Sequence, residues 1–174
     1  MPAGGGGLTL QISEVPAKIV LDQFLLDAKI KAVGVLDINL NNEDYDYVNV
    51  LDGVATPWSQ ANPLKPIGFT EGVLRIEDML LIYPLDPAVQ TRISLMPHSE
   101  RGIFYMSSFI IQANLYMGEG TALLAAIDSM TKRFLAATEV SLFPMFPTST
   151  ALPETMPIAL LNSAKIYNYH GVED

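Results

Sequence analysis

The stretch I-F-Y-M-S-S-F-I-I-Q-A-N-L-Y-M, residues 103–117, decides the fold class because it is the longest β-type run in the chain. Aromatic and β-branched residues, which favour strands, alternate along it with smaller and polar residues. The run is longer than an ordinary strand of about five or six residues. We therefore expect one long strand with a bend or bulge near Ser107 and Ser108.

Further β-type runs lie on both sides of this stretch, and turn residues separate them. Pairs such as Asp52-Gly53 mark tight turns. Short strands joined by such turns favour antiparallel pairing, so the sequence predicts a mainly β fold, an antiparallel barrel or a sandwich-like sheet. Residues 19–26 suit a short helical segment better than a strand. The other expected strands are residues 8–12, 29–40, 47–51, 73–83, 89–95, 134–143 and 158–169.

One short helix is expected near residues 121–133. Thr121 suits the N-cap position, and Lys132 suits the C-terminal end, where a cation favours the helix dipole. The apolar residues in between recur at helical spacing and form a single stripe, namely Leu123, Leu124, Ile127 and Met130.

The chain has 174 residues, which is enough for one domain with a core of its own. Gly4 to Gly7 predict a flexible arm over residues 1–7, and residues 8–174 are expected to form a single β-rich domain. Residues 76–83 (I-E-D-M-L-L-I-Y) and 160–167 (L-L-N-S-A-K-I-Y) resemble each other, and each follows a proline-broken loop. This likeness suggests a duplicated β unit, with similar halves at 8–100 and 101–174.

Composition excludes several classes of protein. Lys and Arg total 10 against 19 Asp and Glu, a net charge of -9, and the scattered bases form no track for nucleic acid or anionic lipid. The chain has no cysteine and only two histidines, so no cofactor or metal cluster is expected. No apolar run reaches the roughly 18 residues of a membrane span. With no export signal in view, we expect a cytoplasmic protein.

The part of the chain from residue 103 to 170 resembles an uncharacterised family of small bacterial β-rich domains. The similarity is carried by F-I-I-Q-A-N-L-Y-M at 109–117, the following Leu124 to Asp128, F-L-A-A-T-E-V at 134–140 and A-L-L-N at 159–162. Ala113 stands where that family has Gly, and Tyr116 where it has His. The resemblance implies a small barrel-like fold with one helix and no known activity.

The acidic stretch that begins at Asp37 is the one candidate metal site. Asp37, Asn39 and Asn41 match the first, third and fifth positions of a calcium loop. The Gly and the final Glu of such a loop are missing, because Asn42 and Val48 stand there. A solvated loop is therefore the favoured interpretation, with weak calcium binding as the alternative.

The two proline-rich segments, 56–68 and 144–157, carry unusually many apolar residues for loops. Two interpretations stay open: the loops cover the core, or they form a docking surface, for which Trp, Phe and Met are common anchors. The candidate interaction residues in and beside these loops are Trp58, Phe69, Phe143, Met145, Phe146, Leu152 and Met156.

The function expected from these features is that of a non-catalytic structural or interaction module. Its partner would be a second copy or a larger assembly, on which the chain would dock as an accessory subunit, for example at the extramembrane face of a membrane complex. No catalytic signature is present. The alternatives are a hydrolase or isomerase that works through two carboxylates, and a carrier of a small apolar ligand.

Overall fold

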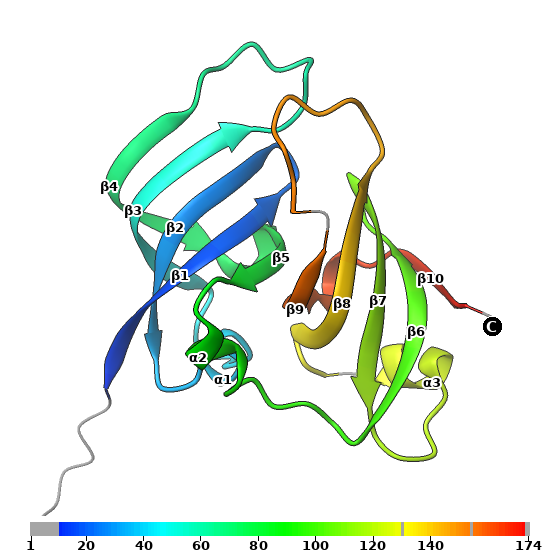
Figure 1. Ribbon diagram of the computed structural model, residues 1–174. Coiled ribbons are helices and arrows are strands. Elements are labelled where there is room, and N and C mark those ends of the chain that lie inside the picture. The colour runs from blue at the N-terminus through cyan, green and yellow to red at the C-terminus, as the bar shows by residue number, and fades with distance from the viewer. Residues whose placement is uncertain (1–10, 130, 154, 173–174) are drawn as a thin grey trace, which may run out of the picture.

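A computed structural model describes residues 11–172 apart from 130 and 154, and it contains one ten-stranded antiparallel sheet. The strand order is β10-β6-β7-β8-β9-β5-β1-β2-β3-β4. Figure 1 shows β4 and β10 at opposite ends of the molecule. The mainly antiparallel β fold is confirmed, and the sheet is open, because its two edge strands do not pair and so do not close a barrel.

The first half of the chain forms five strands and a short helix. The strands are β1 (Ile12–Leu21), β2 (Phe24–Val33), β3 (Tyr47–Pro57), β4 (Ile67–Arg75) and β5 (Met79–Pro84). Helix α1 (Leu36–Leu40) lies between β2 and β3, and the 3-10 turn η1 (Ile76–Asp78) between β4 and β5. Helix α2 (Pro87–Gln90) starts the link to the second half and is capped by the Asp86 side chain.

The second half has the same order of elements. Its strands are β6 (His98–Tyr105), β7 (Phe109–Met117), β8 (Phe134–Pro144), β9 (Met156–Asn162) and β10 (Asn168–Gly171). Helix α3 (Leu123–Ser129) lies between β7 and β8, and η2 (Ser163–Lys165) between β9 and β10. The helix expected near 121–133 is thus present, and α1 and α2 are two further short helices. Within the described residues, no helix is long and apolar enough to cross a membrane.

Residues 103–117 form a hairpin, where we expected one bent strand. Chain reversal occurs at Met106–Ser108, so Tyr105 pairs with Ile110 across the turn. The turn has neither Gly nor Pro, and its two serines are held by another hairpin. Ser107 Oγ donates to the Asp22 carboxylate, and Ser108 Oγ donates to the Asp22 carbonyl oxygen at 3.2 Å.

Five other expected elements differ from the structure, and two of them, the strands expected at 73–83 and 158–169, are interrupted by η1 and η2. Residues 19–26 form the end of β1 and the start of β2, where a helical segment was expected, and residues 29–40 leave the strand after Val33 to form α1. Most of the expected strand at 89–95 is irregular after α2. The segments 76–83 and 160–167 are not equivalent: the first is η1 with β5, and the second ends β9 and contains η2.

The two halves nevertheless match strand by strand. Within the sheet the first half runs β5-β1-β2-β3-β4 and the second runs β10-β6-β7-β8-β9. The hairpins have the same register: Phe24 faces Pro57 as Phe109 faces Pro144. The pairing of β2 with β3 shifts after Asp27, and that of β7 with β8 shifts after the corresponding Gln112.

Backbone conformation repeats in the same way. The described residues with positive φ fall into two matched pairs: Gly34 (75°) with Gly120 (74°), and Asp52 (48°) with Glu139 (51°). Each glycine precedes a helix, and a left-handed turn there favours Gly. Each acidic residue lies in the β-bulge and accepts from the second strand, where Lys29 donates to Asp52 at 2.8 Å and Asn114 to Glu139 at 3.0 Å. The halves therefore share the same backbone path with different side chains.

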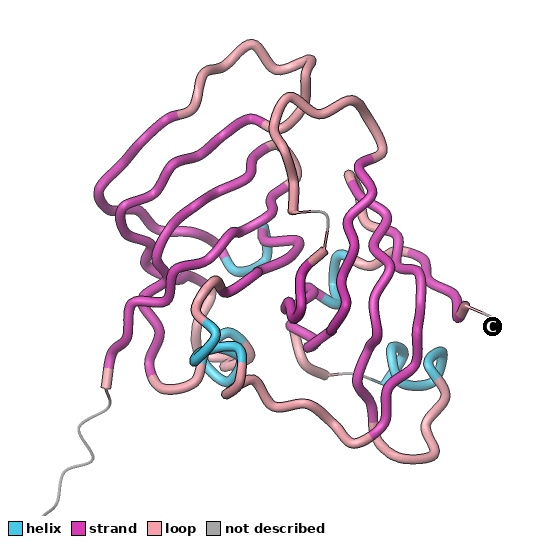
Figure 2. Tube along the Cα trace, viewed as in Figure 1, coloured by secondary structure: helices cyan, strands magenta, loops and turns pink. Residues whose placement is uncertain are grey.

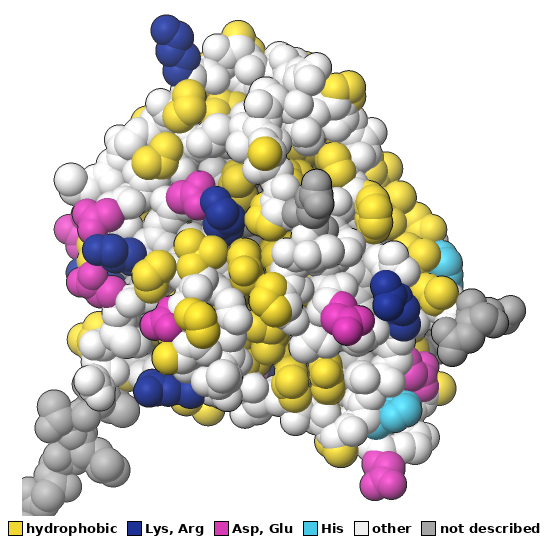
Figure 3. All heavy atoms as spheres, viewed as in Figure 1, with side chains coloured by type: hydrophobic (Ala, Val, Ile, Leu, Met, Phe, Trp, Pro, Cys, Tyr) yellow, Lys and Arg dark blue, Asp and Glu magenta, His cyan; other side chains and the backbone are white. Residues whose placement is uncertain are grey.

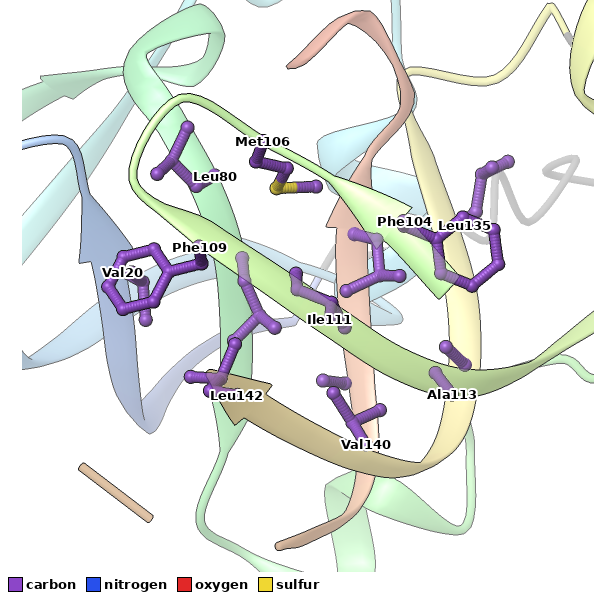
Figure 4. Close-up of a cluster of buried hydrophobic side chains, with 14 of the residues drawn as sticks. Val20, Leu80, Phe104, Met106, Phe109, Ile111, Ala113, Leu135, Val140 and Leu142 are labelled. Carbon is purple, nitrogen blue, oxygen red and sulfur yellow. The ribbon is translucent and has the colours of Figure 1, made fainter. Parts of the chain in front are cut away.

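Each half has a core of its own, and the other half helps to cover it. The second core contains Phe104, Phe109 and Leu115 of its own strands, together with Val20, Leu25 and Leu80 from the first half. Figure 4 shows Val20 beside Phe109 in this cluster. The first core is covered in return by Phe134, Ile158 and Leu160 of β8 and β9. The halves thus pack as one body around the short ladder in which Leu81 faces Leu161 and Ile82 faces Leu160.

Candidate functional site

Two of the predicted interaction residues are core residues. Trp58 is 0% exposed and Met156 1%. The Trp58 ring lies 4.3 Å from the rings of Phe109 and Phe146, and its Nε1 donates to the Leu21 carbonyl oxygen at 3.0 Å. Neither Trp58 nor Met156 can contact a partner in this fold, and the expectation that they form a docking surface is corrected.

The proline-rich loops pair with each other over this core. Ser59 and Thr148 form an isolated β-bridge, and the Ser149 amide donates to the Trp58 carbonyl oxygen at 2.8 Å. Figure 2 shows the two loops side by side. Phe146 and Leu152 are half-buried against the second core. For these two residues, as for Trp58, the structure favours the interpretation in which the loops cover the core.

Two other candidates, Phe143 and Met145, are exposed, 49% and 52% respectively. Phe143 faces Ile110 on the neighbouring strand, and Ile110 faces Tyr105. The Tyr105 ring lies 6.4 Å from that of Tyr167, which is itself 63% exposed. We call the surface formed by Tyr105, Ile110, Phe143 and Tyr167 the outer aromatic face. It lies on β6, β7 and β8 and reaches the segment just before the edge strand β10.

An open apolar pocket of about 300 Å³ lies at the other end of the sheet, on β1 to β4. Phe69, the last predicted interaction residue, lies in this pocket and packs over Gly53. The other residues around it are almost all apolar, including Leu21, Phe24, Leu26, Val50, Ala55, Ile67 and Val73. Figure 3 shows that hydrophobic side chains also reach the surface in bands, with charged side chains dispersed between them. Sequence reasoning found Phe69 but missed the pocket, which exists only where four strands meet.

The outer aromatic face and the apolar pocket are linked by the repeat. Three residues of the outer aromatic face match buried residues of the first half, because Tyr105, Ile110 and Tyr167 stand at the positions of Val20, Leu25 and Leu80. Three residues of the apolar pocket likewise match buried residues of the second half, because Phe24, Ala55 and Phe69 stand at the positions of Phe109, Leu142 and Met156. Inside the chain these two sets of counterparts belong to one buried cluster. The outer aromatic face and the apolar pocket are therefore exposed, although the matching surfaces in the other halves are buried against each other inside the chain.

The three calcium candidates do not form a shared site. Asp37 and Asn39 lie in α1, where residues two apart point to different sides. The Asn41 amide is used in the fold, because Nδ2 donates to the Phe134 carbonyl oxygen at 3.1 Å and Oδ1 accepts from the Phe134 amide at 2.8 Å. Over the described residues, no group of at least three His, Cys, Asp or Glu side chains could hold a metal ion.

A second cavity, of about 260 Å³, lies between α1 and the strands β7 and β8, and Asp37 lines it. A third, of about 470 Å³, contains two carboxylates, Asp46 and Glu77. Both are exposed, and they pair with Arg133 and Arg75 respectively. Surface ion pairs of this kind are ordinary, so the third cavity gives the carboxylate-enzyme alternative no specific support.

Comparison with known proteins gives no relative, since no family model, no curated protein and no solved structure matches this chain. The resemblance of residues 103–170 to a family of small bacterial β-rich domains therefore stays a prediction.

Proposed function

We propose that this chain is a non-catalytic structural module that binds further copies of itself head to tail. In this arrangement the outer aromatic face of one copy covers the apolar pocket of the next. The β10 edge of the first copy would pair with the β4 edge of the second, as β5 pairs with β9 inside each chain.

The single observation that carries this proposal is the difference in burial between matched positions. Val20, Leu25 and Leu80 are at most 2% exposed because the second half covers them. Their counterparts Tyr105 and Ile110 are half-buried, and Tyr167 is exposed. Burial of apolar area contributes about 25 cal/mol per Å², so covering this face with a matching pocket is favourable.

The register of the expected contact follows from the internal junction. Leu81 faces Leu161 and Ile82 faces Leu160 within the chain. At the matched positions, Asn168 of one copy would face Leu74 of the next, and Tyr169 would face Val73. Val73 is 66% exposed on an edge strand, and unpaired edges of this kind readily accept another strand.

A contact between two different surfaces of the same chain has a consequence for assembly. Such a heterologous contact leaves one free face at each end, so copies add until a ring closes or a filament grows. An isologous dimer, in which the same patch meets itself, would stop at two copies. Docking of another protein on the same edges is the alternative that the following experiment separates.

The test combines light scattering with two charge-introducing variants. Lysine is a natural blocker of edge strands and apolar contacts, so Val73→Lys spoils the pocket end and Tyr167→Lys the aromatic end. The matched control is Leu64→Lys, which adds the same charge at a residue 55% exposed in the first proline-rich loop. We expect wild type and the control to show species larger than a dimer as concentration rises toward ~100 μM, a range where weak contacts form.

Mixing the variants gives the decisive result. Each variant alone is expected to be monomeric, while an equal mixture gives a dimer and nothing larger, since each protein keeps one intact face. A wild-type protein that stays monomeric at every concentration would overturn the proposal. A dimer that forms equally with Tyr167→Lys alone would exclude the head-to-tail arrangement.

A further inference from the structure

The cavity beside α1 has an unusual polar feature, a buried carboxylate with one unused oxygen. Asp37 is 7% exposed, and its Oδ2 accepts from the Ser94 amide at 3.3 Å. Its Oδ1 is the one buried side-chain oxygen or nitrogen without a hydrogen-bond partner in the part of the chain that the structure describes. A buried charged group without a partner costs free energy, so a missing donor is expected at this oxygen.

The described groups around the cavity do not supply that donor. The Asn41 Nδ2 donates to the carbonyl oxygens of Asp37 and Phe134 instead of the carboxylate. Lys132 lines the cavity but is exposed. It donates no hydrogen bond to Asp37 Oδ1, which has no partner among the described residues.

We infer that the cavity binds a small organic ammonium ion, with its N–H groups donating to Asp37 Oδ1 and a short apolar tail lying along the wall. An ammonium group has three donors and one positive charge, which matches a carboxylate oxygen that lacks both a donor and a counter-charge. A bare metal ion fits poorly, because Ca²⁺ takes six to eight oxygen ligands and Asp37 is the one carboxylate among the cavity's described residues.

The walls and the size define the tail. The wall includes apolar residues from both halves, among them Met96, Met117, Phe134, Leu135 and Leu160, and Thr121 and Thr131 lie among its polar residues. The volume of about 260 Å³ equals that of roughly eight or nine water molecules at about 30 Å³ each. The ligand is therefore a primary amine with fewer than about ten non-hydrogen atoms.

The test uses n-butylammonium chloride as the probe and n-butanol as its neutral counterpart with the same tail. Binding is followed by amide chemical shifts in two-dimensional NMR, which need no variant. We expect butylammonium to shift the amides near Asp37 and Ser94 saturably, and butanol to bind about tenfold or more weakly. Equal binding of the two probes, or no saturable shift with butylammonium, would overturn the inference.

Two variants examine the carboxylate itself. Asp37→Asn removes the charge at nearly constant shape, and it should weaken butylammonium binding about ten- to a hundredfold, the usual effect of losing a hydrogen bond to a charged group. The ligand-free variant should melt at a higher temperature than wild type, because it no longer buries an unpaired charge. Lys132→Met should bind the probe at least as tightly as wild type, since a nearby cation is gone. Unchanged binding in Asp37→Asn, or lost binding in Lys132→Met, would contradict the site.

Discussion

The sharpest prediction concerns a pair of cross-strand neighbours that the two halves fill in opposite ways. Gly53 faces Phe69 in the first half, and the matched pair in the second half is Val140 facing Met156. A Cβ at Gly53 would lie 2.1 Å from Cζ of the Phe69 ring. No side chain fits there while the ring stays in place. The first half therefore has a glycine beneath the rigid Phe69 ring, whereas the second half has the branched Val140 beneath the flexible Met156 side chain.

The test replaces the residue pair of the first half with the pair found in the second half. Gly53→Val alone should destabilise the protein by about 2–3 kcal/mol, the upper part of the range for overpacking. Phe69→Met alone should cost less than about 1.5 kcal/mol, because it nearly conserves volume and the site is half-buried. The double variant restores the pair found in the second half, so we expect it to recover about 1–2 kcal/mol relative to the sum of the two.

Urea unfolding followed by the fluorescence of Trp58, the single tryptophan, measures these free energies. For a chain of this size each kcal/mol also moves the melting temperature by about 2–4 °C. Gly68→Val is the matched control, because a Cβ there has its nearest neighbour at 3.9 Å and should cost little. Additive effects of Gly53→Val and Phe69→Met, within about 0.5 kcal/mol, would refute the reasoning that the two halves are interchangeable at this position.

Two further predictions concern Trp58 and Lys29. Trp58→Ala should lower the free energy of unfolding by about 3–5 kcal/mol. Trp58→Phe should lower it by about 1–3 kcal/mol, because the part-buried Leu21 carbonyl oxygen loses its donor. A cost below about 1 kcal/mol for Trp58→Ala in urea unfolding would contradict its core role. The hydrogen bond and the charge of Asp52 raise the pKa of Lys29 above 10.5, so the stabilisation by this pair is complete below that pH and is lost as pH rises through the pKa of the folded state. An NMR titration should show a lower Lys29 pKa in Asp52→Asn than in wild type, and an unchanged midpoint would exclude the pair as the cause.

Much of the β character could be predicted from local pattern alone. Strand β8 and helix α3 lie close to the ranges expected for them, because alternation and helical spacing of apolar residues are local signals. The duplication could also have been found more securely in the sequence. F-L-L-D-A at 24–28 and F-I-I-Q-A at 109–113 are matched segments of β2 and β7 in the structure. They mark the duplication correctly, whereas the likeness between 76–83 and 160–167 joins segments that are not equivalent.

The hairpin at 106–108 and the position of Trp58 could not be predicted in this way. Ser107 and Ser108 turn the chain because Asp22, far away in sequence, holds their hydroxyl groups. Trp58 is buried because a second loop and Phe109 close around it. Neither contact leaves a local mark in the sequence.

What the sequence determined by itself is the kind of chain: mainly antiparallel strands, a short helix after residue 120, and no cysteine chemistry, since these depend on composition and on neighbours within a few residues. The tertiary structure decided which apolar residues are hidden and which are left uncovered. Tyr167 and Leu80 occupy matched positions, yet only Leu80 has a second half packed over it. Burial depends on what lies across from a residue in space, and that is settled by how the two halves join.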